Sequence, residues 1–138
     1  NNTFRELVEI LKNHGEVLTE HVAEKDPKMR EQNHLSKEEI YLRDMGWLEE
    51  SDALVAEVSA HSTGVGYEIA KAESCGKPIL CIFKKEARQR ISAMVGGNRS
   101  GKVEVKEYSS LKEARQIIEN FLEKISRTSV GGAGQKAP

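Results

Sequence analysis

Apolar residues along this chain follow two patterns, one typical of helices and one typical of buried strands. Residues 1–13 are predicted to form a helix that ends at Gly15, since four apolar side chains recur at helical spacing: Phe4, Leu7, Val8 and Leu11. Ser36 followed by Glu39 matches a capping box, which predicts a second helix from Lys37 to about Glu50. The apolar residues expected to contact the core from this helix are Ile40, Met45, Trp47 and Leu48.

Turn residues and polar stretches divide the middle of the chain. Residues 21–35 are polar and show no apolar period, so they are predicted to form a loop. A turn rich in serine, threonine and glycine, 59–66, leads into a helix predicted from about Val65 to Ser74. A short helix is predicted over 87–94, and Gly96-Gly97 interrupts it.

The end of the chain carries one more helix signal. Ser110 with Glu113 repeats the capping-box pattern and predicts a last helix, which ends near Ile125. Beyond it, residues 126–138 are rich in glycine and have no apolar period, which predicts a disordered tail. We therefore expect one domain over residues 1–125.

Short apolar runs between the helices predict strands. They are Val17–Leu18, Ala53–Val58, Ile79–Phe83 and a last strand marked by Val103 and Val105. Strands that alternate with helices indicate parallel β-α-β units, so the predicted class is α/β: a doubly wound, Rossmann- or flavodoxin-like parallel sheet flanked by helices. Ligands of such sheets bind beyond the carboxyl ends of the strands, near the point where the strand order reverses. Candidate site residues are therefore sought in 19–21, in 59–68 and after Phe83.

The charge balance of the sequence argues against some classes of binding partner. Hydrophobic residues make up 38% and charged residues 31%, and 21 Lys+Arg against 22 Asp+Glu leave a net charge of −1. This balance argues against a protein that binds a nucleic-acid polymer or a membrane surface. Cys75 and Cys81 show no metal-ligand spacing and are expected to be reduced thiols. No apolar run approaches the roughly 20 residues of a membrane span and no signal-peptide pattern is present, so the expected location is the cytoplasm and also the nucleus.

The turn 62–68 is the strongest candidate for ligand binding. Gly64 and Gly66 lie at a strand-to-helix turn, where glycines let a ligand approach the backbone. The amides of the first helical turn favour an anion there, and Ser62 could both cap the helix and donate to a phosphate. A Gly-x-Gly pattern alone is more often a simple tight turn than a ligand-binding turn.

Two carboxylates suggest glycoside-type chemistry, which needs an ionised nucleophile and an acid that protonates the leaving group. Glu68 follows the turn, and Asp44 lies in the preceding helix. From the residues alone, however, Glu68 is better explained as a first-turn acid that the helix dipole stabilises. Asp44 is likewise better explained as a solvated acid paired with Arg43.

Other candidates have equally ordinary explanations. His21, just past a predicted strand, could contact a substrate or be a loop histidine. Ser92 reads as an ordinary helix serine, and Trp47 is expected in the core rather than as a stacking platform.

Several segments together resemble the 2′-deoxynucleoside 5′-phosphate N-hydrolases of the nucleoside 2-deoxyribosyltransferase superfamily. The resemblance is collinear and spans roughly Phe4 to Phe121. The segments that carry it are Val17–Ala23, Asp44–Asp52, Val55–Val58, Gly64-Val65-Gly66-Tyr67-Glu68, Gly76–Cys81 and Ile91-Ser92-Ala93-Met94.

The resemblance implies a retaining double displacement that cleaves the N-glycosidic bond of a deoxyribonucleoside 5′-monophosphate. It implies that Glu68 attacks the anomeric carbon to form a covalent ester, and that Asp44 positions Glu68 or assists the leaving base. Ser62 matches a serine that contacts the 5′-phosphate, and His21 matches a histidine on the base side. Ser92 matches a serine that reaches the neighbouring subunit's phosphate, which implies a homodimer. The resemblance implies no cofactor and no metal.

This sequence departs from the family at one point. Family members begin with a strand and a turn of the pattern Tyr-x-x-Gly-Ser-Ile-Arg-Gly-Gly, which is not found here. We therefore expect strand 17–18 to lack the neighbour that joins it to strand 53–58, and expect the intact protein to have further N-terminal residues. Two alternative functions stay open: a nucleoside deoxyribosyltransferase, or a non-catalytic nucleotide-binding or interaction module if that strand is truly absent.

Overall fold

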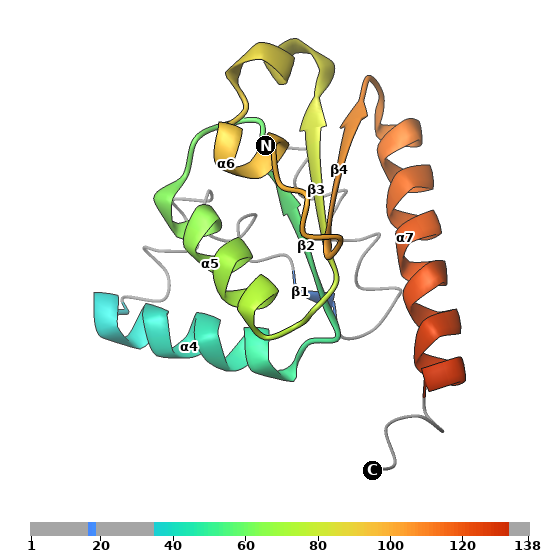
Figure 1. Ribbon diagram of the computed structural model, residues 1–138. Coiled ribbons are helices and arrows are strands. Elements are labelled where there is room, and N and C mark those ends of the chain that lie inside the picture. Colours follow the sequence, from blue (N-terminus) through green and yellow to red (C-terminus); the bar gives the residue numbers. More distant parts are fainter. Residues whose placement is uncertain (1–16, 19–34, 133–138) are drawn as a thin grey trace.

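The protein is built on a parallel β-sheet with helices on both faces (Figure 1). The computed structural model describes residues 17–18 and 35–132. Four strands pair in the order β1-β2-β3-β4, and every pair is parallel. The strands are β1 Val17–Leu18, β2 Ala53–Glu57, β3 Ile79–Lys84 and β4 Val103–Tyr108. The predicted α/β class with a parallel sheet is confirmed.

The central strands are buried on both faces, which explains their unbroken apolar runs. Successive side chains point to opposite faces of the sheet. Val55, Leu80 and Ile82 therefore pack with helix α7 (Leu111–Gly132), on one side. Leu54, Ala56, Ile79 and Cys81 pack on the other side with residues of helices α4 (Lys37–Glu50) and α5 (Thr63–Ser74).

Helix α4 begins at the predicted residue because its capping box forms. The Ser36 hydroxyl accepts from the backbone N–H of Glu39 at 3.1 Å, and the Glu39 carboxylate accepts from the N–H of Ser36 at 3.0 Å. The hydrogen bonds that Ser36 donates hold the pKa of Glu39 below its ordinary value. The predicted core contact of Leu48 is confirmed, but Trp47 is 43% exposed and lies beneath the Arg43 guanidinium, so its expected burial is wrong.

The segment between β3 and β4 differs from the prediction. Instead of one helix over 87–94, a 3₁₀ helix η1 (Lys85–Arg90) is followed by a short helix α6 (Ala93–Gly96). Ile91, which separates the two helices, has extended backbone. Ser92 begins α6 because its hydroxyl accepts from the N–H of Met94 at 3.2 Å.

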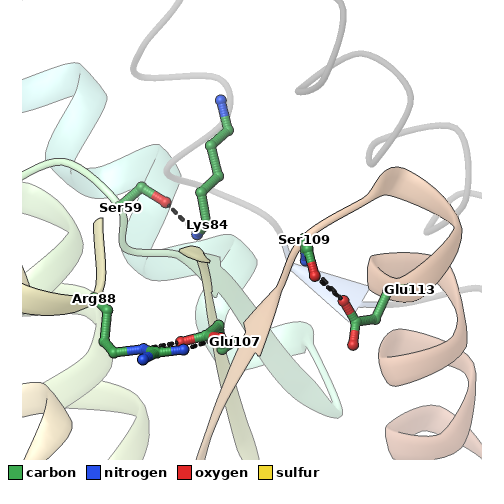
Figure 2. A network of polar contacts seen from close by, with 6 residues as sticks. All are labelled: Ser59, Lys84, Arg88, Glu107, Ser109 and Glu113. Carbon is green, nitrogen blue, oxygen red and sulfur yellow. Dashed lines mark hydrogen bonds and ion pairs between the residues drawn. The ribbon is translucent and has the colours of Figure 1, made fainter. Parts of the chain in front are cut away.

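Helix α7 begins as predicted but is longer. The Ser110 hydroxyl accepts from the N–H of Glu113 at 3.1 Å, whereas the Glu113 carboxylate accepts from Ser109, at 2.7 Å from its N–H and 2.9 Å from its hydroxyl (Figure 2). The helix continues to Gly132, so the predicted end near Ile125 is too early. Residues 133–138 lie outside the described residues, and a disordered tail there stays a prediction.

The expected gap in the sheet is not present. Val17 pairs with Ala53 and Leu18 with Leu54, so β1 is a direct neighbour of β2. This pairing satisfies backbone groups that a gap would leave without hydrogen bonds in the interior. Among the described strands the order does not reverse, so they contain no switch point.

Two further parts of the sequence-based prediction, besides the tail 133–138, fall on residues that the structure does not describe. They are the helix over 1–13 and the loop that contains His21. Within the described ranges, no helix is both long enough and apolar enough to cross a bilayer.

Candidate functional site

The predicted phosphate-contacting residues meet at a cavity near the carboxyl end of the sheet. A cavity of about 580 Å³ lies between the loop after β2, the first turns of α5 and the start of α6. Ser62, Gly66 and Ser92 all contribute to its lining, as do the apolar residues Val65 and Ile69. One chain therefore places both Ser62 and Ser92 at this cavity, whereas the resemblance implies that Ser92 reaches the site of the neighbouring subunit.

Ser62 is the N-cap of α5. Its hydroxyl accepts from the N–H of Val65 at 3.2 Å, and its carbonyl accepts from the N–H of Gly66 at 3.1 Å. A Cβ added at Gly66 would meet no protein atom within 4 Å, so packing within the described residues does not require a glycine there. Gly64 lies half-buried in the same first turn. This arrangement presents a helix N-terminus, which favours an anion, at the edge of the cavity.

Two contacts hold the segment that carries Ser92. Arg88 in η1 makes a two-pronged ion pair with Glu107 in β4, from Nε at 2.5 Å and from the terminal nitrogen at 2.7 Å (Figure 2). Those hydrogen bonds hold the pKa of Glu107 below its ordinary value. The second contact joins the two walls of the cavity, because His61 Nε2 donates to the carbonyl of Arg90 at 2.5 Å. His61 was not among the predicted site residues.

Glu68 lies within the buried stripe of α5. The buried residues of that helix are Val65, Glu68, Ile69 and Ala72, a spacing that places them on one face. Glu68 is 3% exposed, and it lies in the second turn rather than the first. The explanation as a first-turn acid that the helix dipole stabilises is therefore wrong. A carboxylate in an apolar stripe is unfavourable unless it has a specific role or partner.

Asp44 lies on the buried face of α4, as Glu68 does on α5. It is 4% exposed, and with Leu48 it is one of the two buried residues of that helix. Its Oδ1 accepts from Nε of Arg43 at 3.1 Å, so the expected pairing with Arg43 forms. Asp44 is buried rather than solvated, which overturns the ordinary explanation for this acid.

Both carboxylates border one apolar cluster. Leu48, one turn after Asp44, packs in the same core cluster as Val65 and Ile69, which flank Glu68 on its helix. On the exposed side, the rings of Tyr41 and Tyr67 meet edge to face, with centroids 6.1 Å apart. The cavity at Ser62 and Ser92 is lined by neither carboxylate.

A third buried carboxylate was missed. Glu57 at the end of β2 is 3% exposed, and its oxygens accept hydrogen bonds from Ser59 and from the Tyr108 hydroxyl. Burial, and then the hydrogen bond to Glu57, raise the pKa of Tyr108 well above its ordinary value, so its hydroxyl stays protonated and donates. The signal was present in the sequence as a charged residue inside an apolar strand.

Comparison with known proteins identifies the family. A model of the family described as nucleoside 2-deoxyribosyltransferase matches residues 1–108. A 5-hydroxymethyl-dUMP N-hydrolase of Mus musculus is 36% identical over 122 residues, which cover 87% of this chain and 70% of that protein. A protein of Methanosarcina barkeri named "Putative 2'-deoxynucleoside 5'-phosphate N-hydrolase 1" is 42% identical over 122 residues. These residues cover 87% of this chain and 74% of the Methanosarcina barkeri protein. The chain belongs to the nucleoside 2-deoxyribosyltransferase family.

Proposed function

We propose that this protein hydrolyses the N-glycosidic bond of 2′-deoxyribonucleoside 5′-monophosphates, releasing the free base and deoxyribose 5-phosphate. The observation that carries the proposal is the burial of Glu68 in the apolar face of α5, on the helix whose first turn borders the cavity. Family membership and the names of the relatives support it.

The proposed reaction has two displacements at the anomeric carbon. A carboxylate oxygen of Glu68 attacks this carbon, the bond to the base nitrogen breaks, and its electron pair leaves with the base. Asp44 positions Glu68 or supplies the proton that the departing base takes up. Water then attacks the same carbon and releases the sugar from the Glu68 ester.

The substrate phosphate is proposed to bind at the start of α5. Ser62, with Gly64 and Gly66 in the following turn, offers a hydroxyl and backbone amides to an anion. His21 is proposed on the base side.

We also propose a homodimer in which Ser92 reaches the neighbouring subunit's site. Ser92 is exposed, and Met94 beside it is 84% exposed, so both side chains are accessible to a neighbouring subunit.

The central test is Glu68→Gln, which keeps the shape of the side chain and removes its charge. Release of free base from deoxyguanosine monophosphate, followed by chromatography, is expected to fall by at least about a hundredfold. Glu50→Gln, an exposed change on α4, is the matched control. Unchanged base release in Glu68→Gln would remove the catalytic assignment.

Transfer of the sugar to another base is the alternative reaction, because the family is described as a deoxyribosyltransferase family. Incubation with a deoxyribonucleoside monophosphate and a second, labelled base separates the two. Hydrolysis predicts deoxyribose 5-phosphate in both the presence and the absence of the acceptor. Preferential appearance of a labelled nucleotide would replace the hydrolase proposal with a transferase.

A further inference from the structure

The buried carboxylate of Glu57 collects three donors at the carboxyl end of the sheet. Its Oε1 accepts from the N–H of Ser59 at 2.8 Å. Its Oε2 accepts from the Ser59 hydroxyl at 2.7 Å and from the Tyr108 hydroxyl at 2.6 Å. These hydrogen bonds offset the loss of hydration that the side chain undergoes on burial.

These contacts tie the ends of three strands together. Glu57 ends β2, and Tyr108 ends β4. The Ser59 hydroxyl also accepts from the N–H of Lys84, the last residue of β3, at 2.8 Å (Figure 2). In the same view the Lys84 side chain extends away from this contact, so only its backbone takes part. Glu57 therefore accepts from Tyr108 of β4 and from Ser59, and Ser59 in turn accepts from Lys84 of β3. Together they fasten the loop after β2 to both strands.

That loop leads directly to the helix start that carries the proposed phosphate contact. Val58 donates from its N–H to the carbonyl of Ile82 at 2.8 Å, which extends the strand pairing one residue past β2. Ser59 is held by Glu57, and His61 by the carbonyl of Arg90. The next residue is Ser62, whose position at the cavity is thus set by the anchors before it.

We propose that Glu57 is a positioning residue for phosphate recognition, which acts by holding the 58–62 loop so that Ser62 and the first turn of α5 face the 5′-phosphate. The proposal rests on the proposed function for its substrate. Glu57 accepts its hydrogen bonds from Ser59 and Tyr108, and the proposed displacements give it no part. It therefore acts on how tightly the substrate is held, more than on the rate of bond breaking.

Steady-state kinetics on the full chain test whether Glu57 affects substrate binding more than the rate of bond breaking. The variants are Glu57→Gln, Ser59→Ala and Tyr108→Phe; the last keeps the buried ring and removes only the hydroxyl. Each is expected to raise KM for deoxyguanosine monophosphate by roughly tenfold, as the loss of one strong hydrogen bond in the network predicts, with kcat changed less than about twofold.

Ile118→Val is the matched control for a purely structural effect. Ile118 is fully buried in the cluster beneath α7, and this change lowers stability without touching the loop. A rise in KM in Ile118→Val equal to that in Tyr108→Phe, at an equal fall in Tm, would overturn the proposal. So would a fall in kcat with unchanged KM in the three network variants.

Hydrogen–deuterium exchange gives a readout that needs no turnover. In Tyr108→Phe, the amides of residues 59–66 are expected to exchange faster than in the native protein, while those of β3 before Lys84 are unchanged. Exchange at 59–66 no faster than in Ile118→Val would contradict the positioning role. If the native protein releases no base from any deoxyribonucleotide, the proposed function fails, and the exchange measurement still decides whether Glu57 holds the loop.

Discussion

Nε of Arg43 donates a hydrogen bond to Oδ1 of the adjacent Asp44 at 3.1 Å, so the buried acid of α4 is oriented by its own chain neighbour. The Arg43 guanidinium is itself fixed from the other side, because it lies 4.7 Å from the centroid of the Trp47 ring. Arg43 thus contacts both the Trp47 ring and the Asp44 carboxylate on the same helix.

We expect Arg43→Gln to lower kcat/KM for deoxyribonucleotides by about tenfold, because Asp44 loses a charge-assisted hydrogen bond that fixes its orientation. Trp47→Leu should have a smaller effect in the same direction, since it removes only the support of the guanidinium. Base-release kinetics measure both. Arg115→Gln, an exposed change on α7, is the control, and an equal loss there would rule out a specific role for Arg43.

Ser62 is expected to serve the fold and the site by separate means, and two substitutions separate them. Ser62→Ala removes both the helix cap and the hydroxyl, and should lower stability by about 1 kcal/mol, whereas glycine is an acceptable cap and Ser62→Gly should lose only a few tenths. Both variants should raise KM for the monophosphate equally. Thermal unfolding and kinetics measured on the same preparations check this, and a KM that follows Tm would mean that Ser62 acts through stability alone.

If Ser92 serves the neighbouring subunit, two inactive or weakened variants should complement each other. In a mixed dimer of Glu68→Gln and Ser92→Ala, one site has both native residues and the other has neither. Mixing the two proteins after reversible unfolding is therefore expected to restore activity above the sum of the parents. Activity equal to that sum, in a sample shown to contain mixed dimers, would place Ser92 in its own subunit's site.

The two cysteines should differ in reactivity. Burial raises the pKa of the Cys81 thiol to about 12, so it stays protonated and inert at neutral and mildly alkaline pH, whereas Cys75 is exposed. A thiol reagent should modify one cysteine in the native protein and two after unfolding. Because the unfolded thiol ionises near its ordinary pKa of 9.0, this group also reduces stability as pH rises from about 9 to about 12. Cys81→Ala should flatten that part of the stability profile.

Local signals in the sequence were sufficient for much of the secondary structure. The start of α4 was predicted because Ser36 and Glu39 interact only with each other's backbone, so the contact needs no knowledge of the rest of the fold. Apolar runs likewise predicted β2 and β3, because parallel strands buried on both faces cannot carry polar side chains freely. Trp47 was misplaced because apolar character alone does not show which face of α4 meets the sheet.

The site needed information that no local pattern contains. The residues alone favoured ordinary explanations for Asp44 and Glu68, and only resemblance suggested chemistry before the structure showed both to be buried. Glu57 was marked locally only as a charged residue inside an apolar strand, and its partner Tyr108 is 51 residues further along the chain. Tertiary hydrogen bonds of this separation are set by the packing of the sheet, which sequence period does not specify.

The two capping serines share a property of hydrogen-bond direction. Ser62 and Ser92 each accept from a backbone N–H, so each hydroxyl has its own proton left to donate outward. In the proposed site, both hydroxyls can therefore donate a hydrogen bond to an acceptor such as a phosphate oxygen. Aspartate caps a helix as well as serine but has no proton to give at neutral pH. A chain with aspartate at either position would retain its helix start and repel the ligand that serine is suited to bind.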